Sequence, residues 1–265
     1  MDGPDLTRPR CSASRLGIRR TDHGATGLRR IPDRGSHRLD RAHYGDAVRS
    51  IRGLVAAALI GLALGAGAGF ADSVPLMLNE VGKARADRSG WSQASEFVSL
   101  ILDSGWAWAA TAVLTGWLVS RPRRHHTGQD TATAGGTPRP IVGATAGFVA
   151  LSIATVAFYA VQAPFADSWD GWRYQAQFWL ARALVLGMPL GAAGVLVRRG
   201  GIAGALAALV VPAGAVLNLI VLPLPHESRM AVPAQVTIWI GAAAGVVLIV
   251  LRLVRERTRS AAPST

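Results

Sequence analysis

Residues 97–124 read FVSLILDSGWAWAATAVLTGWLVSRPRR, and this stretch decides the fold class of the chain. Residues 97–119 are predominantly apolar, with Asp103 as their one charged side chain. A helix of about 20 residues crosses a hydrocarbon core of roughly 30 Å, so this run is long enough to span a membrane. Three arginines follow it, Arg121, Arg123 and Arg124. An apolar run that ends in arginines is typical of a transmembrane helix with its basic end in the cytoplasm.

The composition of the whole chain agrees with this interpretation. Of the 265 residues, 50% are hydrophobic and only 17% are charged, whereas a soluble domain usually carries about 25% charged residues. A membrane β-barrel would show alternating segments of about ten residues, but the apolar runs here are continuous. We therefore predict an all-α membrane protein whose main partner is the lipid bilayer.

Six apolar runs are long enough to span, and we predict transmembrane helices at about residues 54–71, 97–119, 141–163, 178–197, 202–222 and 236–254. The second, fourth and sixth runs end at arginines, so the six spans form three hairpins in a transmembrane domain of residues 49–257. A short cytoplasmic tail, residues 258–265, follows. We expect Ser92 to cap the second helix and Pro189 to kink the fourth.

The distribution of charge sets the predicted orientation. Twelve arginines adjoin one end of the spans, whereas the loops at the other end hold seven acids and five basic residues. Because basic residues are retained in the cytoplasm, we predict a multi-pass protein of the plasma membrane with both termini cytoplasmic. The net charge of +12 does not indicate nucleic-acid binding, since the basic residues lie at helix ends rather than along one face of a soluble domain.

Residues 1–48 depart from the apolar pattern. The first 47 of them contain ten arginines and six acids without helical or strand periodicity, so we predict a disordered Arg-rich segment. It could contact anionic headgroups or act in targeting; alternatively, translation starts at Val48 and the segment is not made. The first span also resembles a signal peptide that ends before Asp72, although its length favours a retained helix.

Charged residues inside a membrane domain are candidates for function. Asp103 lies six residues into its span, and Arg182 lies four residues into the fourth, which places them roughly 9 Å and 6 Å from the helix ends. Gln162 and Asn218 belong to the same level. Aspartate is too short to reach the interface, so Asp103 needs a partner, water or a proton. We interpret Asp103 as joining the hairpins, in a structural ion pair with Arg182 or as a hydrogen-bonded acid. A solute or proton site is the second interpretation, and an exposed position from a misplaced helix boundary is the third.

Aromatic residues gather toward the same side. Seven of the eight tryptophans lie near the predicted outer ends of the spans, and Trp117 alone lies at an inner end. This pattern is typical of an interfacial aromatic belt. It would also suit an aromatic cleft with Asp103 and Arg182 at its floor.

Glycines recur every four residues in several spans, for example Gly61, Gly65 and Gly69. Such a stripe lets a neighbouring helix approach closely, either within the chain or in a homo-oligomer. The tetrapeptide FADS occurs at 70–73 and again at 165–168. A match this short is either chance or the trace of a duplicated hairpin.

Motifs of known chemistry do not occur in the sequence. HExxH, the Gly-rich phosphate loop with its lysine, and GxSxG are all missing. Cys11 is the one cysteine, which excludes an intrachain disulfide and a Cys-rich metal site. His125 and His126 are adjacent in a polar loop and are interpreted as solvated. We therefore predict no cofactor, no metal site and no assigned catalytic residue.

The motif LDSGWAWA at residues 102–109, with the arginine-ended hairpins and a Gly-rich fifth span, resembles a group of actinobacterial six-helix integral membrane proteins of unknown function. The likeness covers about residues 50–255. It implies the membrane class and a bacterial plasma membrane, and it carries over no catalytic or binding residue.

Three functional hypotheses remain open at this point. The first is a structural or partner-binding role, the second is a small-solute permease with an outer-leaflet polar site, and the third is an intramembrane enzyme. A permease needs a polar path, which the inner halves of the spans lack, and an enzyme needs a second acid or base near Asp103. A cavity that reaches Asp103 would favour solute binding, whereas a sealed ion pair would favour a structural role.

Overall fold

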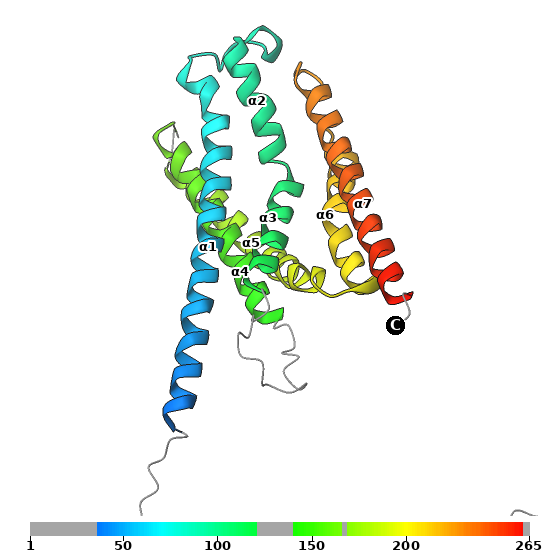
Figure 1. Cartoon of the computed structure of the whole chain (residues 1–265). Coiled ribbons are helices and arrows are strands. Elements are labelled where there is room, and N and C mark those ends of the chain that lie inside the picture. The colour runs from blue at the N-terminus through cyan, green and yellow to red at the C-terminus, as the bar shows by residue number, and fades with distance from the viewer. Residues whose placement is uncertain (1–35, 121–139, 166–168, 262–265) are drawn as a thin grey trace, which may run out of the picture. The chain divides into compact units, whose positions relative to one another are not determined.

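The computed structural model describes residues 36–120, 140–165 and 169–261, and every regular element in these ranges is helical (Figure 1). The α-helices are α1 (Ser36–Met77), α2 (Gly90–Leu102), α3 (Gly105–Val119), α4 (Pro140–Gln162), α5 (Trp169–Val197), α6 (Gly201–Val221) and α7 (Ala231–Ala261). Two short 3-10 turns are η1 (Arg85–Asp87) and η2 (Ala163–Phe165).

The helices have the dimensions of membrane spans. Five of them are long and apolar enough to cross a membrane, and the bent pair α2 and α3 makes a sixth span if it is counted as one. The protein is therefore all-helical with five or six candidate spans in the described part of the chain.

The first helix is longer than the sequence pattern indicated. It begins at Ser36, so residues 36–48, for which we predicted disorder, are helical; residues 1–35 lie outside the described part of the chain. Residues 36–48 contain no proline, and their arginines and alanines favour helix, so the apolar helix extends backward through them. At its other end α1 continues past Pro75 to Met77. Asp72 consequently lies in a helix rather than in a loop.

The second predicted span is not one continuous helix. It consists of α2 and α3, which are bent by 55° where they meet at residues 103–104. α2 starts at Gly90 and is capped by Ser89, whose side chain accepts a hydrogen bond from the Ser92 N–H. The prediction that Ser92 is the cap is therefore wrong. Pro189, where we expected a kink, lies inside α5 without interrupting it.

The backbones of α3, α4 and α5 pack so closely that no side chain fits between them at their glycines. A Cβ atom added to Gly191 of α5 would overlap the carbonyl oxygen of Gly143 on α4, and one added to Gly116 of α3 would overlap the carbonyl oxygen of Gly191. Gly61 and Gly65 bring α1 equally close to the backbone of α4. These glycine stripes are therefore used for packing within the chain.

The helices α6 and α7 run side by side (Figure 1) and share a small core of Ala215, Leu219, Ile238 and Ala242. The turn between α5 and α6 is held against α7 by hydrogen bonds. Arg252 donates hydrogen bonds to the carbonyl oxygens of Val197 (2.7 Å) and Arg199 (3.3 Å), and Glu256 accepts one from the Gly201 N–H at 2.8 Å. Gly201 has a φ of +75°, which favours glycine at this turn.

Candidate functional site

The junction of α2 and α3 interrupts the backbone hydrogen bonding of a candidate membrane span. Ser104 precedes the first residue of α3, but its hydroxyl donates to the Ile101 carbonyl oxygen at 2.5 Å and does not cap α3. The regular hydrogen bonding of α2 ends with the Asp103 N–H donating to the Ser99 carbonyl oxygen, and the first N–H groups of α3 have no partner in a preceding helical turn. Irregular backbone at membrane depth is tolerated where it is buried in protein or lines a polar cavity.

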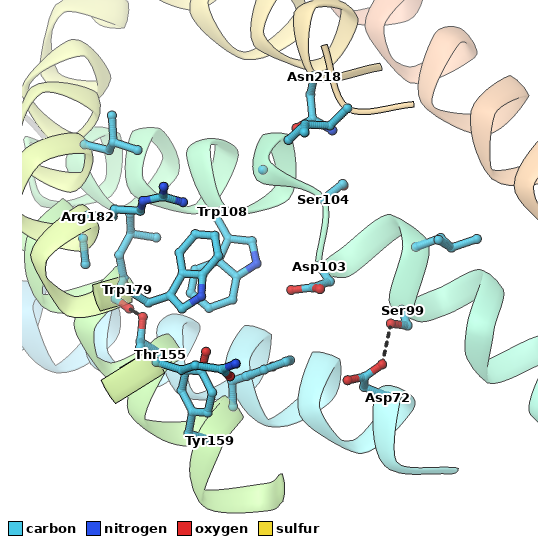
Figure 2. Close-up of a pocket in the computed structure, with 18 of the residues that line it drawn as sticks. Asp72, Ser99, Asp103, Ser104, Trp108, Thr155, Tyr159, Trp179, Arg182 and Asn218 are labelled. Atoms are coloured by element: carbon cyan, nitrogen blue, oxygen red, sulfur yellow. Dashed lines mark hydrogen bonds between the residues drawn. The ribbon is translucent and has the colours of Figure 1, made fainter. Parts of the chain in front are cut away.

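A cavity of about 560 Å³ lies beside this junction (Figure 2). Ligand pockets in proteins usually measure roughly 300–1,000 Å³. The cavity is lined by all four residues singled out from the sequence, Asp103, Gln162, Arg182 and Asn218. They come from the α2–α3 junction, α4, α5 and α6 respectively. The tertiary structure therefore gathers into one cavity the polar residues that the sequence placed at one level.

Asp103 is the unpaired acid of this cavity. Its backbone N–H closes the end of α2 by donating to the Ser99 carbonyl oxygen at 2.8 Å. Among the described residues, no side chain donates a hydrogen bond to its carboxylate or forms an ion pair with it. The ion pair that we predicted with Arg182 is thus not formed. The Asp103 side chain is exposed in the cavity, so a solute, water or a proton has to satisfy it.

A second carboxylate, Asp72 of α1, lines the same cavity and is held in place by protein groups. Its Oδ2 accepts a hydrogen bond from Gln162 Nε2 at 2.7 Å, and its Oδ1 accepts a longer one from Ser99 Oγ at 3.5 Å. Figure 2 shows Asp72 and Asp103 on the same side of the cavity. This side therefore carries two carboxylates, of which one is bonded and one is unpaired.

Arg182 occupies a different part of the cavity wall. Its guanidinium carbon lies 4.0 Å from the ring centroid of Phe178 and 4.9 Å from that of Trp179. Stacking on aromatic rings uses the face of the guanidinium group, so the N–H groups in its plane stay available to an acceptor. In the view of Figure 2, the indole rings of Trp108 and Trp179 lie between Arg182 and Asp103.

Aromatic side chains form much of the remaining wall. Trp108 packs edge-to-face on Phe158 with ring centroids 6.5 Å apart, and Phe158 packs in the same way on Tyr159 at 5.3 Å. The indole N–H of Trp108 is buried and has no partner in the described part of the chain. An unsatisfied buried donor costs roughly 1–3 kcal/mol. Two of the tryptophans assigned to the aromatic belt, Trp108 and Trp179, therefore line the cavity.

Asn218 lies where α6 faces the α2–α3 junction. A Cβ atom added to Gly105, the first residue of α3, would come within 3.2 Å of the Asn218 side-chain oxygen. A larger residue at position 105 would therefore be in steric conflict with the Asn218 side chain. The glycine keeps the start of α3 close to this amide.

The connection between α1 and α2 is fixed by Glu80. Glu80 is buried, and its carboxylate accepts hydrogen bonds from Ser92 Oγ (2.5 Å), the Ser89 N–H (3.1 Å), Ser89 Oγ (3.0 Å) and Lys83 Nζ (3.1 Å). The Ser92 bond is the largest influence on the pKa of Glu80. Together with the Ser89 and Lys83 bonds it outweighs the effect of burial and lowers this pKa from 4.5 to about 2. An ionised carboxylate therefore links the residues of the α1–α2 connection through hydrogen bonds.

A second cavity of about 270 Å³ lies next to this connection. It shares three lining residues with the larger cavity, Asp72, Ser99 and Leu100. Its other polar residues include Arg85 and Glu96, which form an ion pair at 2.9 Å. Asp72, Ser99 and Leu100 therefore separate two cavities.

Two features of the site were not found by sequence reasoning. The apolar pattern ends the first span at residue 71 and so leaves Asp72 outside it, although residues 70–74 contain no glycine or proline and α1 continues past Asp72 and Pro75. The α2–α3 junction was read as a continuous helix, although the triplet Asp103-Ser104-Gly105 consists of residues that favour turns. That triplet was the available signal for a break.

Comparisons of this chain with protein-family models, with curated proteins and with solved structures found no match. In the described ranges, no group of three or more His, Cys, Asp and Glu residues is placed to hold a metal ion. His125 and His126 lie outside those ranges. The function is therefore argued from the geometry of the cavity.

Proposed function

We propose that this protein binds a small solute in the cavity beside the α2–α3 junction, as a permease with a polar site in the outer leaflet would. The observation that carries the proposal is the unpaired carboxylate of Asp103 in a cavity of about 560 Å³. In a purely structural role, a neighbouring side chain would neutralise this acid, because an unpaired charge at membrane depth is costly. An acid kept free in an open cavity suits a ligand.

The broken span supports the same proposal. Membrane transporters commonly build their sites from discontinuous helices, whose free N–H and carbonyl groups bind the charged groups of solutes and ions. Here the carbonyl end of α2 and the N–H end of α3 meet at Asp103 and Ser104, beside the cavity. The backbone and the side chains therefore offer polar groups at the same place.

We further propose that the cavity opens to the outside of the cell. It lies toward the end of the helices that carries the α1–α2 connection, whereas Arg198, Arg199 and Arg252 lie at the other end. The positive-inside rule assigns the arginine end to the cytoplasm. Backbone contact among α3, α4 and α5 closes that end, so transport would require a second arrangement in which these helices separate.

Cysteine accessibility tests the proposal directly. Cys11 is the one natural cysteine, so Cys11→Ser provides a cysteine-free background. We expect Asn218→Cys to react with a membrane-impermeant methanethiosulfonate reagent added outside intact cells. The control is Ala112→Cys, because Ala112 is fully buried and should not react. An unreactive Asn218→Cys in correctly folded protein would indicate a sealed structural site and contradict the proposal.

Solute binding is then tested with matched cavity variants. Leu186 lines the cavity and Leu184, on the same helix, does not; both side chains are about half exposed (53% and 47%). A panel of small amines, carboxylates, amino acids and sugars is screened for an increase in the Tm of the protein in nanodiscs. A true solute should lose its effect in Leu186→Trp and keep it in Leu184→Trp, and uptake into proteoliposomes then tests transport. Equal behaviour of the two variants would exclude the cavity as the site.

One observation favours the enzyme hypothesis as a second candidate. That hypothesis requires another acid or base near Asp103, and Asp72 lines the same cavity. Mass spectrometry of a bound or transported compound separates the two functions. A permease returns the compound unchanged, whereas an enzyme converts it, and the conversion would be lost in Asp72→Asn.

A further inference from the structure

We infer that the solute carries a cationic ammonium-type group and an anionic group, separated by an apolar part. This inference rests on the proposed function, because it describes what the same cavity would bind. It follows from three features of the cavity wall, which are the carboxylates on one side, Arg182 elsewhere in the wall, and the aromatic surface that accompanies them.

The side with the two carboxylates favours a cation. Asp72 already accepts hydrogen bonds from Gln162 and Ser99, so its position is set before a solute arrives. Asp103 has no protein partner in the described chain and faces the cavity (Figure 2). The carbonyl end of the α2 helix dipole adds partial negative charge at the same place. An ammonium group could satisfy the Asp103 carboxylate in this negative environment.

The Arg182 side favours an anion. The guanidinium face is covered by Phe178 and Trp179, at 4.0 and 4.9 Å from the two ring centroids. What remains is the edge of the group, which presents parallel N–H donors that match the two oxygens of a carboxylate. No acidic side chain of the described residues occupies this edge. The guanidinium group is a cation with hydrogen-bond donors only, so an anion is the natural partner.

Neither charge neutralises the other in the structure, because Asp103 and Arg182 form no ion pair. A solute with a single charge would leave the opposite group unpaired in a cavity of low polarity, which is costly. A solute with two opposite charges satisfies both groups. Its middle part would lie along the indole rings of Trp108 and Trp179 and should therefore be apolar.

The probes are four compounds with the same six-carbon chain: 6-aminohexanoate, hexylamine, hexanoate and hexanol. The full-length chain in nanodiscs is titrated with each by isothermal titration calorimetry. Hydrogen bonds to charged groups are strong enough to change affinity by about tenfold or more. We therefore expect 6-aminohexanoate to bind at least about tenfold more tightly than hexylamine or hexanoate. The shorter 4-aminobutanoate and the longer 8-aminooctanoate then determine which separation of charges fits best.

Charge variants assign each end of the probe. Asp103→Asn should weaken hexylamine and 6-aminohexanoate by about tenfold and leave hexanoate unchanged. Arg182→Gln should weaken hexanoate and 6-aminohexanoate and leave hexylamine unchanged. The controls are Asp87→Asn and Arg173→Gln, which alter exposed charges outside the cavity and should change no affinity.

The outcomes separate this inference from the proposed function. If hexanol binds as tightly as 6-aminohexanoate, or if both charge variants leave all affinities unchanged, the inference is overturned and solute binding stands. If no probe binds but Asn218→Cys is labelled, the solute class is wrong while the cavity remains accessible. If no probe binds and Asn218→Cys is also unreactive, the proposed function fails as well.

Discussion

The helices α3, α4 and α5 pack closely at one end and enclose a cavity at the other. At one end Gly116, Gly143 and Gly191 bring the three backbones into direct contact. At the other end the same helices carry Trp108 and Trp179, among other large side chains, and enclose a cavity of about 560 Å³. Helix spacing follows from the size of the side chains between the axes. Small residues close one end of the bundle, and large residues hold the other end open.

The largest expected effect comes from filling the closed end. Gly191→Ala places a Cβ atom against the backbone of Gly143 and Gly147, which cannot move aside as a flexible side chain can. We expect a loss of about 1–3 kcal/mol in the free energy of unfolding, measured as a lower Tm in detergent. Gly241→Ala is the control, since a Cβ atom there meets nothing within 4 Å and alanine favours helix by about 0.4–1 kcal/mol. Equal effects of the two variants would contradict the close packing.

The next effect concerns the α1–α2 connection above the open end. The pKa of Glu80 is about 2 in the folded protein, against an ordinary value of 4.5. A lowered folded-state pKa stabilises the protein above the unfolded value, and this stabilisation is lost as the pH falls toward the folded value. The Tm of the natural protein should therefore exceed that of Glu80→Gln at pH 6, and the difference should shrink from about pH 4.5 downward. A difference that does not change between pH 6 and pH 3 would show that Glu80 is not held as an ionised group.

A smaller effect contrasts two acids on the same segment. Asp103 is unpaired, whereas Glu96 forms an ion pair with Arg85 at 2.9 Å and is buried. Asp103→Asn removes an unpaired charge, so we expect stability to rise by about 1 kcal/mol, as is common when a functional group is replaced. Glu96→Gln should lower stability instead, because it leaves Arg85 without its partner. A loss of stability in Asp103→Asn would favour the structural interpretation of this acid.

The smallest expected effect is a coupling energy close to zero. If Asp103 and Arg182 formed a structural pair, the losses in Asp103→Ala and Arg182→Ala would not add in the double variant. The structure shows no ion pair between them, so the two changes in the free energy of unfolding should add within about 0.5 kcal/mol. A larger coupling energy in a double-mutant cycle would support the interpretation of Asp103 and Arg182 as a structural ion pair.

The sequence by itself determined the properties that depend on local composition. Runs of apolar residues long enough to span a bilayer predicted an all-helical membrane protein, because helix length and hydrophobicity are local quantities. Counting residues along each run also placed Asp103, Gln162, Arg182 and Asn218 at one level. All four line the same cavity, because residues at equal depth on neighbouring helices meet when those helices pack.

Only the tertiary structure decided how these residues are paired. Gln162 bonds to Asp72, Arg182 stacks on Phe178 and Trp179, and Asp103 lies without a protein partner in the described chain, at the break in a candidate span. The rotation and spacing of each helix select such partners, and both depend on contacts with other helices far away in the chain. The stretch 97–124 therefore carried the membrane signal in its own residues, whereas the cavity beside Asp103 exists only because α1, α4, α5 and α6 surround it.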